Sequence, residues 1–225
     1  MYEIIPSPGT ENKNWSEIEQ KLHSVSPFTR TIHIDVVDGK FAQDKPFIDP
    51  APFAKYTKDL PAGKAGYIFE VHLMVNEPIH YLKRFADAGF GRFIGQIEHM
   101  SDQVAFVAQA QLYGDVVLAL DKQTPIADIH VPLIDLDGIT IMTIQAGASG
   151  QQFQEALLDK VKHLRAKTDI PIEVDGGIND ETITAAAVAG ANRFVATSFL
   201  FALNTPEQQF HLLEEKLKAI QEGNK

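Results

Sequence analysis

The sequence predicts a single (β/α)8 TIM barrel that takes in all of residues 1–225. Three observations support this prediction. Short β-branched runs alternate with longer amphipathic segments almost to the end of the chain, which is typical of parallel strands joined by helices. A length of 225 residues suits about eight such units in one closed barrel. Polar residues also gather where several strands end, which is where barrels of this class place their functional groups.

The predicted strands are short, and β-branched or aromatic residues dominate them, which favours extended backbone. In chain order they are residues 2–6, 31–36, 67–74, 92–98, 116–120, 138–144, 170–174 and 193–196. The small-residue segment 60–66 interrupts the alternation before the third strand, and we expect it to be a surface loop.

The predicted helices lie between these strands and place apolar residues at helical spacing. In chain order they are residues 14–25, 78–88, 101–113, 152–167, 179–189 and 205–221. Pro78 suits a first helical turn, and Gly89 follows the end of the same helix. Asn179 or Asp180 can cap the helix at 179–189, and Gly190 can close it.

An open, doubly wound sheet is the alternative architecture. Such a sheet usually carries a G-x-G-x-x-G turn after its first strand, whereas this chain has Ser7-Pro8-Gly9-Thr10 there. The barrel is therefore the favoured fold, and we expect no second domain.

Composition excludes several classes of protein. The net charge of −10 argues against nucleic acid or an anionic membrane as a partner, because both attract basic surfaces. The absence of cysteine excludes disulfides and thiolate zinc sites. The start of the chain does not resemble a secretory signal, and the apolar runs are well short of the roughly 18 residues that span a bilayer. We therefore expect a cytoplasmic protein.

Metal-binding side chains occur at three of the predicted strand ends. His33 and Asp35 lie two residues apart on one strand, so their side chains share a face. His72 lies near the end of the next strand, and Asp175 ends the seventh. If these ends converge, two imidazoles and two carboxylates meet around one point. Such a nitrogen and oxygen set suits one divalent ion, either zinc, iron(II), manganese or cobalt.

Small residues follow the last three strands, in Ala146-Gly147-Ala148-Ser149-Gly150, Gly176-Gly177 and Thr197-Ser198. Loops after the seventh and eighth strands of such barrels often bind phosphate through backbone amides. Because the chain is acidic, a general positive field cannot attract the anion. These loops therefore predict a local cradle for a phosphate group.

An ordered set of short motifs runs along nearly the whole chain. They are Pro6-Ser7, His33 to Gly39 (like H-x-D-x-M-D-G), Val71 to Val75 (V-H-L-M-V), Ala119-Leu120 with Thr124-Pro125, Met142 to Phe153 (like M-T-V-x-P-G-F-G-G-Q-x-F), Val174 to Ile178 (V-D-G-G-I) and Val195 to Phe201 (like V-x-G-S-x-x-F). Each motif is weak alone, but the ordered set is specific. Together they resemble the ribulose-phosphate 3-epimerase family.

The resemblance implies a barrel that is usually oligomeric and binds one divalent ion through His33, Asp35, His72 and Asp175. It implies epimerisation at C3 of a small sugar phosphate, from D-ribulose 5-phosphate to D-xylulose 5-phosphate. Loss of a proton beside the carbonyl leaves an enediolate, and inversion needs one base on each face of it. Asp35 and Asp175 are the expected pair. The residues expected to bind substrate are Ser7, His72, Met74, Met142, Gly147, Ala148, Ser149, Gly150, Gly176, Gly177, Thr197 and Ser198.

Four positions depart from the family pattern. Val37 replaces a methionine, Gln96 stands where the family usually has histidine, and Thr197 replaces a glycine. The segment 146–150 lacks the proline and the aromatic residue of P-G-F-G-G. These changes leave the four proposed metal ligands intact, so they bear on substrate and rate more than on the class of reaction.

Three alternatives stay open. The altered loop permits an epimerase of a related six-carbon ketose phosphate, and the same loop with Thr197 permits a sugar-phosphate-binding barrel without turnover. Metal-assisted decarboxylation or aldol chemistry would require a lysine at a strand end. Lys40 and Lys45 lie in a following loop instead, so this alternative ranks last.

Overall fold

A computed structural model of the chain describes residues 1–11, 14–42, 47–57, 66–147, 150–203 and 205–223. Its eight strands form one parallel sheet in the order β1-β8-β7-β6-β5-β4-β3-β2. The strands are β1 (Glu3–Pro6), β2 (Thr31–Val37), β3 (Ile68–Met74), β4 (Arg92–Gln96), β5 (Asp115–Leu120), β6 (Gly138–Met142), β7 (Ile172–Asp175) and β8 (Arg193–Ala196).

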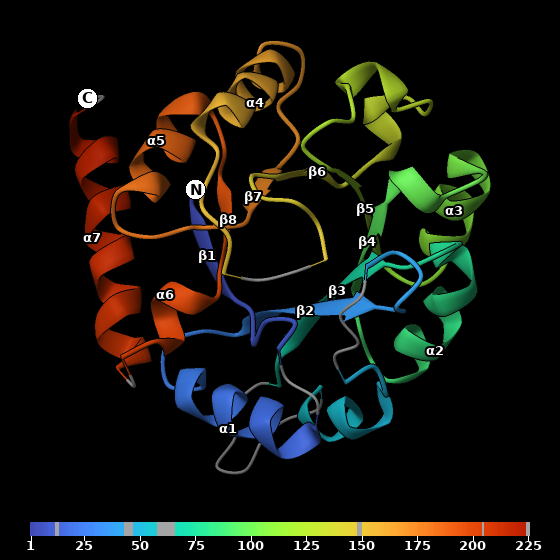
Figure 1. Cartoon of the computed structure of the whole chain (residues 1–225), viewed down its shortest axis with the longest axis horizontal. Coiled ribbons are helices and arrows are strands. Elements are labelled where there is room, and N and C mark those ends of the chain that lie inside the picture. Colours follow the sequence, from blue (N-terminus) through green and yellow to red (C-terminus); the bar gives the residue numbers. More distant parts are fainter. Residues whose placement is uncertain (12–13, 43–46, 58–65, 148–149, 204, 224–225) are drawn as a thin grey trace.

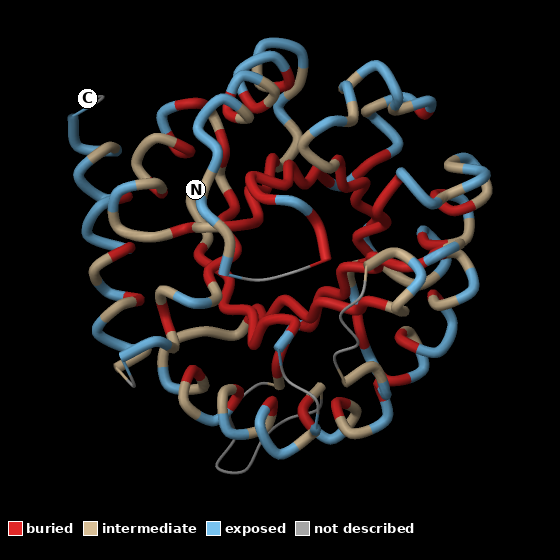
Figure 2. The backbone as a smooth tube through the Cα atoms, in the orientation of Figure 1, coloured by how far each residue is buried: buried red, intermediate tan, exposed pale blue. Residues whose placement is uncertain are grey.

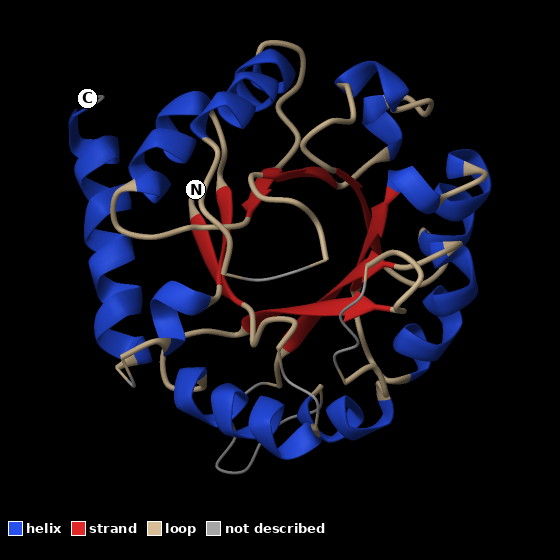
Figure 3. Ribbon diagram, viewed as in Figure 1, coloured by secondary structure: helices blue, strands red, loops and turns tan. Residues whose placement is uncertain are grey.

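Side chains join β1 to β2 and complete the ring of strands. The Ser7 hydroxyl donates to Asp35 at 2.9 Å, and the Thr31 hydroxyl donates to Glu3 at 2.6 Å. The strands surround a central space, and the helices form an outer ring (Figures 1 and 3). The predicted (β/α)8 barrel is confirmed, and the doubly wound alternative is wrong.

The helices agree with the prediction in order, with differences at their ends. The α-helices are α1 (Trp15–Val25), α2 (Leu82–Asp87), α3 (Gln103–Ala110), α4 (Leu158–Arg165), α5 (Thr182–Ala189), α6 (Ser198–Phe201) and α7 (Pro206–Gly223). The 3-10 turns are η1 (Ala51–Tyr56), η3 (Pro78–Tyr81), η4 (Ile97–His99), η5 (Ile126–Asp128), η6 (Leu133–Asp135) and η7 (Glu155–Leu157). The predicted helices at 78–88 and 152–167 thus each begin with a 3-10 turn.

Local signals account for several of the helix ends. The Asn179 side chain accepts from the backbone nitrogen of Thr182 at 2.9 Å, so Asn179 and not Asp180 acts at the start of α5. Gly190 ends α5 with a φ of 112°, a left-handed conformation that favours glycine. The short segments η1 and α6 were not predicted, because four to six residues are too few to show helical periodicity. Most of the expected loop at 60–66 lies outside the described residues.

Alternation along the strands separates the apolar core from the polar interior of the barrel. On β2, Ile32, Ile34 and Val36 belong to the large core between the strands and the helices. His33 and Asp35 therefore point to the inside of the barrel. Figure 2 shows the inner ring of the backbone, where the strands lie, as mostly buried. This arrangement places polar side chains from distant parts of the chain together in a space screened from water.

A buried ion-pair network occupies part of this interior. Arg193 on β8 donates to Glu173 at 3.0 Å and forms further ion pairs with Glu70 on β3 and Glu3 on β1. Since β3 and β8 are not neighbours in the sheet, these contacts cross the inside of the barrel.

Among the described residues, no helix is both long enough and apolar enough to cross a bilayer.

Candidate active site

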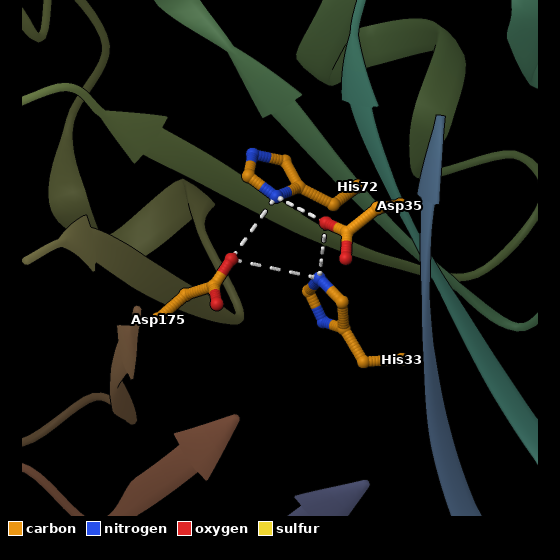
Figure 4. Close-up of side chains that lie close together, drawn as sticks. All are labelled: His33, Asp35, His72 and Asp175. Atoms are coloured by element: carbon orange, nitrogen blue, oxygen red, sulfur yellow. Dashed lines mark hydrogen bonds and ion pairs between the residues drawn. The ribbon is translucent and has the colours of Figure 1, made fainter. Parts of the chain in front are cut away.

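Four side chains that could hold a metal ion, from β2, β3 and β7, meet inside the barrel (Figure 4). His33 Nε2 lies 3.3 Å from Asp35 Oδ1 and 3.8 Å from Asp175 Oδ2. His72 Nδ1 lies 3.4 Å from each of the same two oxygens. One donor atom of each residue lies within 4.8 Å of the other three. The structure thus brings together all four residues that the sequence suggested as ligands.

The donor set suits a cation. His72 Nδ1 is the one buried side-chain nitrogen or oxygen in the described part of the chain without a hydrogen-bond partner. In a neutral imidazole its lone pair would face the two carboxylates of Asp35 and Asp175, which is unfavourable unless a positive charge lies between them. Two imidazole nitrogens and two carboxylate oxygens are ligands that zinc, iron(II), manganese and cobalt accept.

The electrostatics of the cluster point in the same direction. Burial alone would lower the pKa of His72, but the nearby carboxylates of Asp175 and Asp35 raise it to about 9. Burial also opposes a charge on His33, yet its pKa is raised well above the usual value, mainly by the charge of Asp35. The protein therefore favours positive charge at this point, which either protons or one divalent ion can supply.

The two aspartates differ in their affinity for a proton. Burial would raise the pKa of Asp35, but the charge of His33 and its hydrogen bond hold it well below the usual value. The pKa of Asp175 is raised, first by burial and then by the charge of Asp35. Two carboxylates with separated pKa values in one site are suited to opposite roles in proton transfer.

Each histidine makes a buried hydrogen bond on the side away from the cluster. His33 Nδ1 donates to Glu70 Oε1 at 2.8 Å, which leaves Nε2 toward the aspartates. His72 Nε2 lies 2.7 Å from Gln96 Oε1, which leaves Nδ1 toward them. Because the second ring nitrogen determines which tautomer is present, Glu70 and Gln96 belong to the site even though they do not face its centre.

A pocket with about 440 Å³ of empty volume opens beside the two carboxylates. Ten residues suggested by the sequence line it: Asp35, Met74, Met142, Gly147, Gly150, Asp175, Gly176, Gly177, Thr197 and Ser198. Four further residues line it: Thr10, Ile144, Ile178 and Val195. Thr10 could have been found from the sequence, because it follows the first strand and so lies at the same rim of the barrel.

Two residues expected to bind substrate do not line this pocket. Ser7 is fully buried; its hydroxyl donates to Asp35 Oδ2 and accepts from the Gly9 nitrogen at 3.1 Å. This hydrogen bond holds one oxygen of the Asp35 carboxylate in place. His72 is also fully buried, with its Nδ1 3.4 Å from an oxygen of each aspartate. Ala148 and Ser149 lie outside the described residues.

Apolar residues form one wall of the pocket. Val37, Met74, Met142, Ile144 and Ala146 make a small buried cluster, against which Phe41 and Ala42 pack. Gly147 has a φ of 96°, and a Cβ there would lie 2.5 Å from the Cβ of Ala42. The loops after β2 and β6 therefore approach closely over the barrel mouth, and the glycine permits this contact.

Comparison with known proteins finds relatives that match most of the chain. Residues 8–201 match the model of the ribulose-phosphate 3 epimerase family. The chain is 34% identical over 197 residues to ribulose-phosphate 3-epimerase of Schizosaccharomyces pombe, an alignment that covers 85% of this chain and 83% of the relative. It is 35% identical over 182 residues to ribulose-phosphate 3-epimerase of Bacillus subtilis, with 76% and 79% covered.

Solved structures with lower identity share the fold. The crystal structure of 3-keto-L-gulonate-6-phosphate decarboxylase from Vibrio cholerae superimposes with a TM-score of 0.68 at 14% identity and covers 97% of both chains. At this level of identity the likeness concerns the barrel alone.

Proposed function

Because this chain belongs to the ribulose-phosphate 3 epimerase family, it is an isomerase of the epimerase class, and we propose that it converts D-ribulose 5-phosphate to D-xylulose 5-phosphate. The observation that supports this reaction best is the pair of carboxylates, Asp35 and Asp175, that lines one pocket from two different strands. Inversion at a carbon next to a carbonyl requires such a pair of proton-transfer groups, one on each face.

In the proposed mechanism, one of the two carboxylates removes the proton from C3 and leaves a planar enediolate. The other carboxylate delivers a proton to the opposite face, so that the configuration at C3 is inverted. The separated pKa values suit this exchange, because Asp35 is held ionised while Asp175 accepts a proton more readily. The hydroxyl of Ser7 orients the Asp35 carboxylate through its hydrogen bond.

We propose that one divalent ion, either zinc, iron(II), manganese or cobalt, is bound by His33, Asp35, His72 and Asp175. When bound, it supplies positive charge that stabilises the developing enediolate. The buried Nδ1 of His72, which lacks a hydrogen-bond partner, supports this assignment.

The remaining pocket residues fit the two ends of the proposed substrate. Met74 and Met142 belong to the apolar wall and would pack against the carbon chain. The backbone amides of the glycine segments and of Thr197-Ser198, with the Ser198 hydroxyl, would bind the phosphate. Such a local cradle is necessary because the net charge of the chain is −10.

Proton exchange at C3 tests this function directly. The enzyme is freed of metal with a chelator, supplied with each candidate ion in turn, and incubated with ribulose 5-phosphate in deuterated water. We expect NMR to show deuterium at C3 and the appearance of xylulose 5-phosphate with a suitable ion, and neither without one. Binding of the sugar phosphate without exchange would instead favour a non-catalytic barrel, and faster turnover of a six-carbon ketose phosphate would change the assigned substrate.

Thr197 provides a test of the phosphate cradle. A Cβ placed on Gly9 would lie 2.7 Å from the methyl carbon of Thr197, so this side chain fills space between the loops after β1 and β8. Thr197→Gly is therefore expected to leave the KM for ribulose 5-phosphate unchanged or to lower it, as measured by steady-state kinetics. Ser198→Ala, which removes a proposed donor, is the comparison variant and should raise the KM. A tenfold rise for Thr197→Gly, about 1.4 kcal/mol of binding, would mean that the threonine hydroxyl itself binds the phosphate.

A further inference from the structure

Gln96 and Glu98 form a chain of hydrogen bonds that ends on His72. Gln96 is the last residue of β4 and is fully buried, whereas Glu98 lies in the following 3-10 turn and is exposed. Gln96 Oε1 lies 2.7 Å from His72 Nε2, and Gln96 Nε2 donates to Glu98 Oε2 at 2.7 Å. The other oxygen of Glu98 accepts from the backbone nitrogen of Asp121 at 2.8 Å.

The position of Glu98 determines which way the Gln96 amide points. The glutamate accepts hydrogen bonds through both oxygens, so it is the acceptor for the Gln96 amide group. The reverse orientation would place the Gln96 oxygen against a carboxylate oxygen at the same short distance, which is unfavourable because both are acceptors. The Gln96 oxygen must therefore face His72.

This orientation in turn determines the tautomer of His72. An acceptor at 2.7 Å requires a proton on Nε2, so the lone pair of the neutral ring lies on Nδ1. Nδ1 is the buried atom without a hydrogen-bond partner that faces Asp35 and Asp175. We propose that Gln96, oriented by Glu98, is a positioning residue that holds His72 in the Nε2–H tautomer and so presents Nδ1 to the divalent ion.

The two histidines are positioned by opposite nitrogens and by different partners. His33 gives its Nδ1–H to a buried carboxylate, Glu70, and presents Nε2. His72 gives its Nε2–H to a neutral amide and presents Nδ1. The Gln96 amide is neutral and does not ionise. Its orientation is set instead by a charged group beyond it, the exposed carboxylate of Glu98. An exposed surface residue thereby acts on the buried site.

This inference rests on the proposed metal site, and Glu98→Gln tests it with little change in shape. If the oxygen of the amide introduced at position 98 keeps its bond to the Asp121 nitrogen, its NH2 group faces the NH2 group of Gln96. The side-chain amide of Gln96 must then flip, so that its oxygen accepts from position 98. The NH2 group of Gln96 then faces His72 Nε2, which must act as an acceptor, so the Nδ1–H tautomer is favoured. We expect the affinity for zinc to fall by about 10–100-fold, the usual effect of losing such a supporting contact.

The reciprocal double variant Gln96→Glu with Glu98→Gln restores the order of donors and acceptors. The amide at position 98 donates to the carboxylate at position 96, whose other oxygen accepts from His72. We therefore expect this double variant to bind zinc more tightly than either single variant. Glu155→Gln, which removes an exposed negative charge elsewhere on the chain, is the matched control and should not change the affinity.

Two readouts distinguish the possible outcomes. Competition with a chromophoric chelator measures zinc affinity, and long-range proton–nitrogen NMR of the zinc-loaded protein reports which ring nitrogen of His72 carries hydrogen. We expect an Nε2–H in the native protein. Equal affinities for the native protein and Glu98→Gln, or a double variant no better than the single ones, would overturn the positioning role. Failure of the native protein itself to bind zinc or any other candidate ion would refute the metal site, independently of Gln96.

Discussion

Replacing Asp175 with asparagine is expected to lower kcat for C3 epimerisation by about 10²–10⁴-fold while the fold stays intact. Asp175 is the last residue of β7, is 7% exposed and lines the pocket. Its carboxylate lies 3.8 Å from His33 Nε2 and 3.4 Å from His72 Nδ1. An amide has nearly the same shape as the carboxylate, but it cannot accept the proton from carbon. Steady-state kinetics with ribulose 5-phosphate measure the loss, and circular dichroism checks the fold.

Metal binding must be measured in parallel, because Asp175 is also a proposed ligand. Metal content and affinity of Asp175→Asn separate the loss of a base from the loss of the ion. Asp35→Asn should behave in the same way, whereas Asp87→Asn, at the end of α2, should keep full activity. Turnover above roughly a tenth of the native rate in Asp175→Asn, about 1.4 kcal/mol in barrier, would rule out an essential base at this position.

The second large effect concerns stability. Replacing Arg193 with methionine is expected to lower the free energy of unfolding by about 3–5 kcal/mol, because it leaves buried carboxylates without their counter-ion. Glu70 is fully buried and Glu173 is 3% exposed, and both pair with this guanidinium. Burial alone would lower the pKa of Arg193, but the surrounding carboxylates raise it, so the group stays charged. Urea denaturation measures the change.

A double variant separates two contributions to the loss of stability, the unpaired buried charge and the lost packing. Adding Glu173→Gln to Arg193→Met removes one of the uncompensated charges and should recover part of the stability. Lys83→Met breaks an exposed ion pair with Asp87 and should have little effect. If Arg193→Met loses less than about 1 kcal/mol, the carboxylates must be neutral or reached by water once the arginine is gone.

The loss of Arg193 should also disturb the proposed metal site. Glu70 accepts from Arg193 through one oxygen and from His33 Nδ1 through the other. Thr140 similarly holds Glu173 at 3.0 Å from the side of β6. The ion pairs of Arg193 inside the barrel are thus linked, through Glu70, to the orientation of His33, one of the proposed ligands.

The sequence by itself determined the alternation of elements and the position of the proposed ligands. Period-two alternation on β2 already places His33 and Asp35 on one face, and the rule that functional groups lie at strand ends brings His72 and Asp175 to the same rim. These signals are local, so a single sequence can carry them. The strand bounds differ from the prediction by at most two residues at each end, because pairing with neighbours decides where a strand stops.

Only the tertiary structure determined which residues support those ligands through hydrogen bonds and ion pairs. Gln96 departed from the expected pattern without an evident role, and its hydrogen bond to His72 joins two residues that are 24 positions apart. Arg193 and Glu70 are 123 residues apart, and no local pattern indicates that they meet inside the barrel. The hydrogen bond from Ser7 to Asp35 likewise joins residues that lie 28 positions apart. A buried polar group must find a partner, but only closure of the barrel determines which distant side chain provides it.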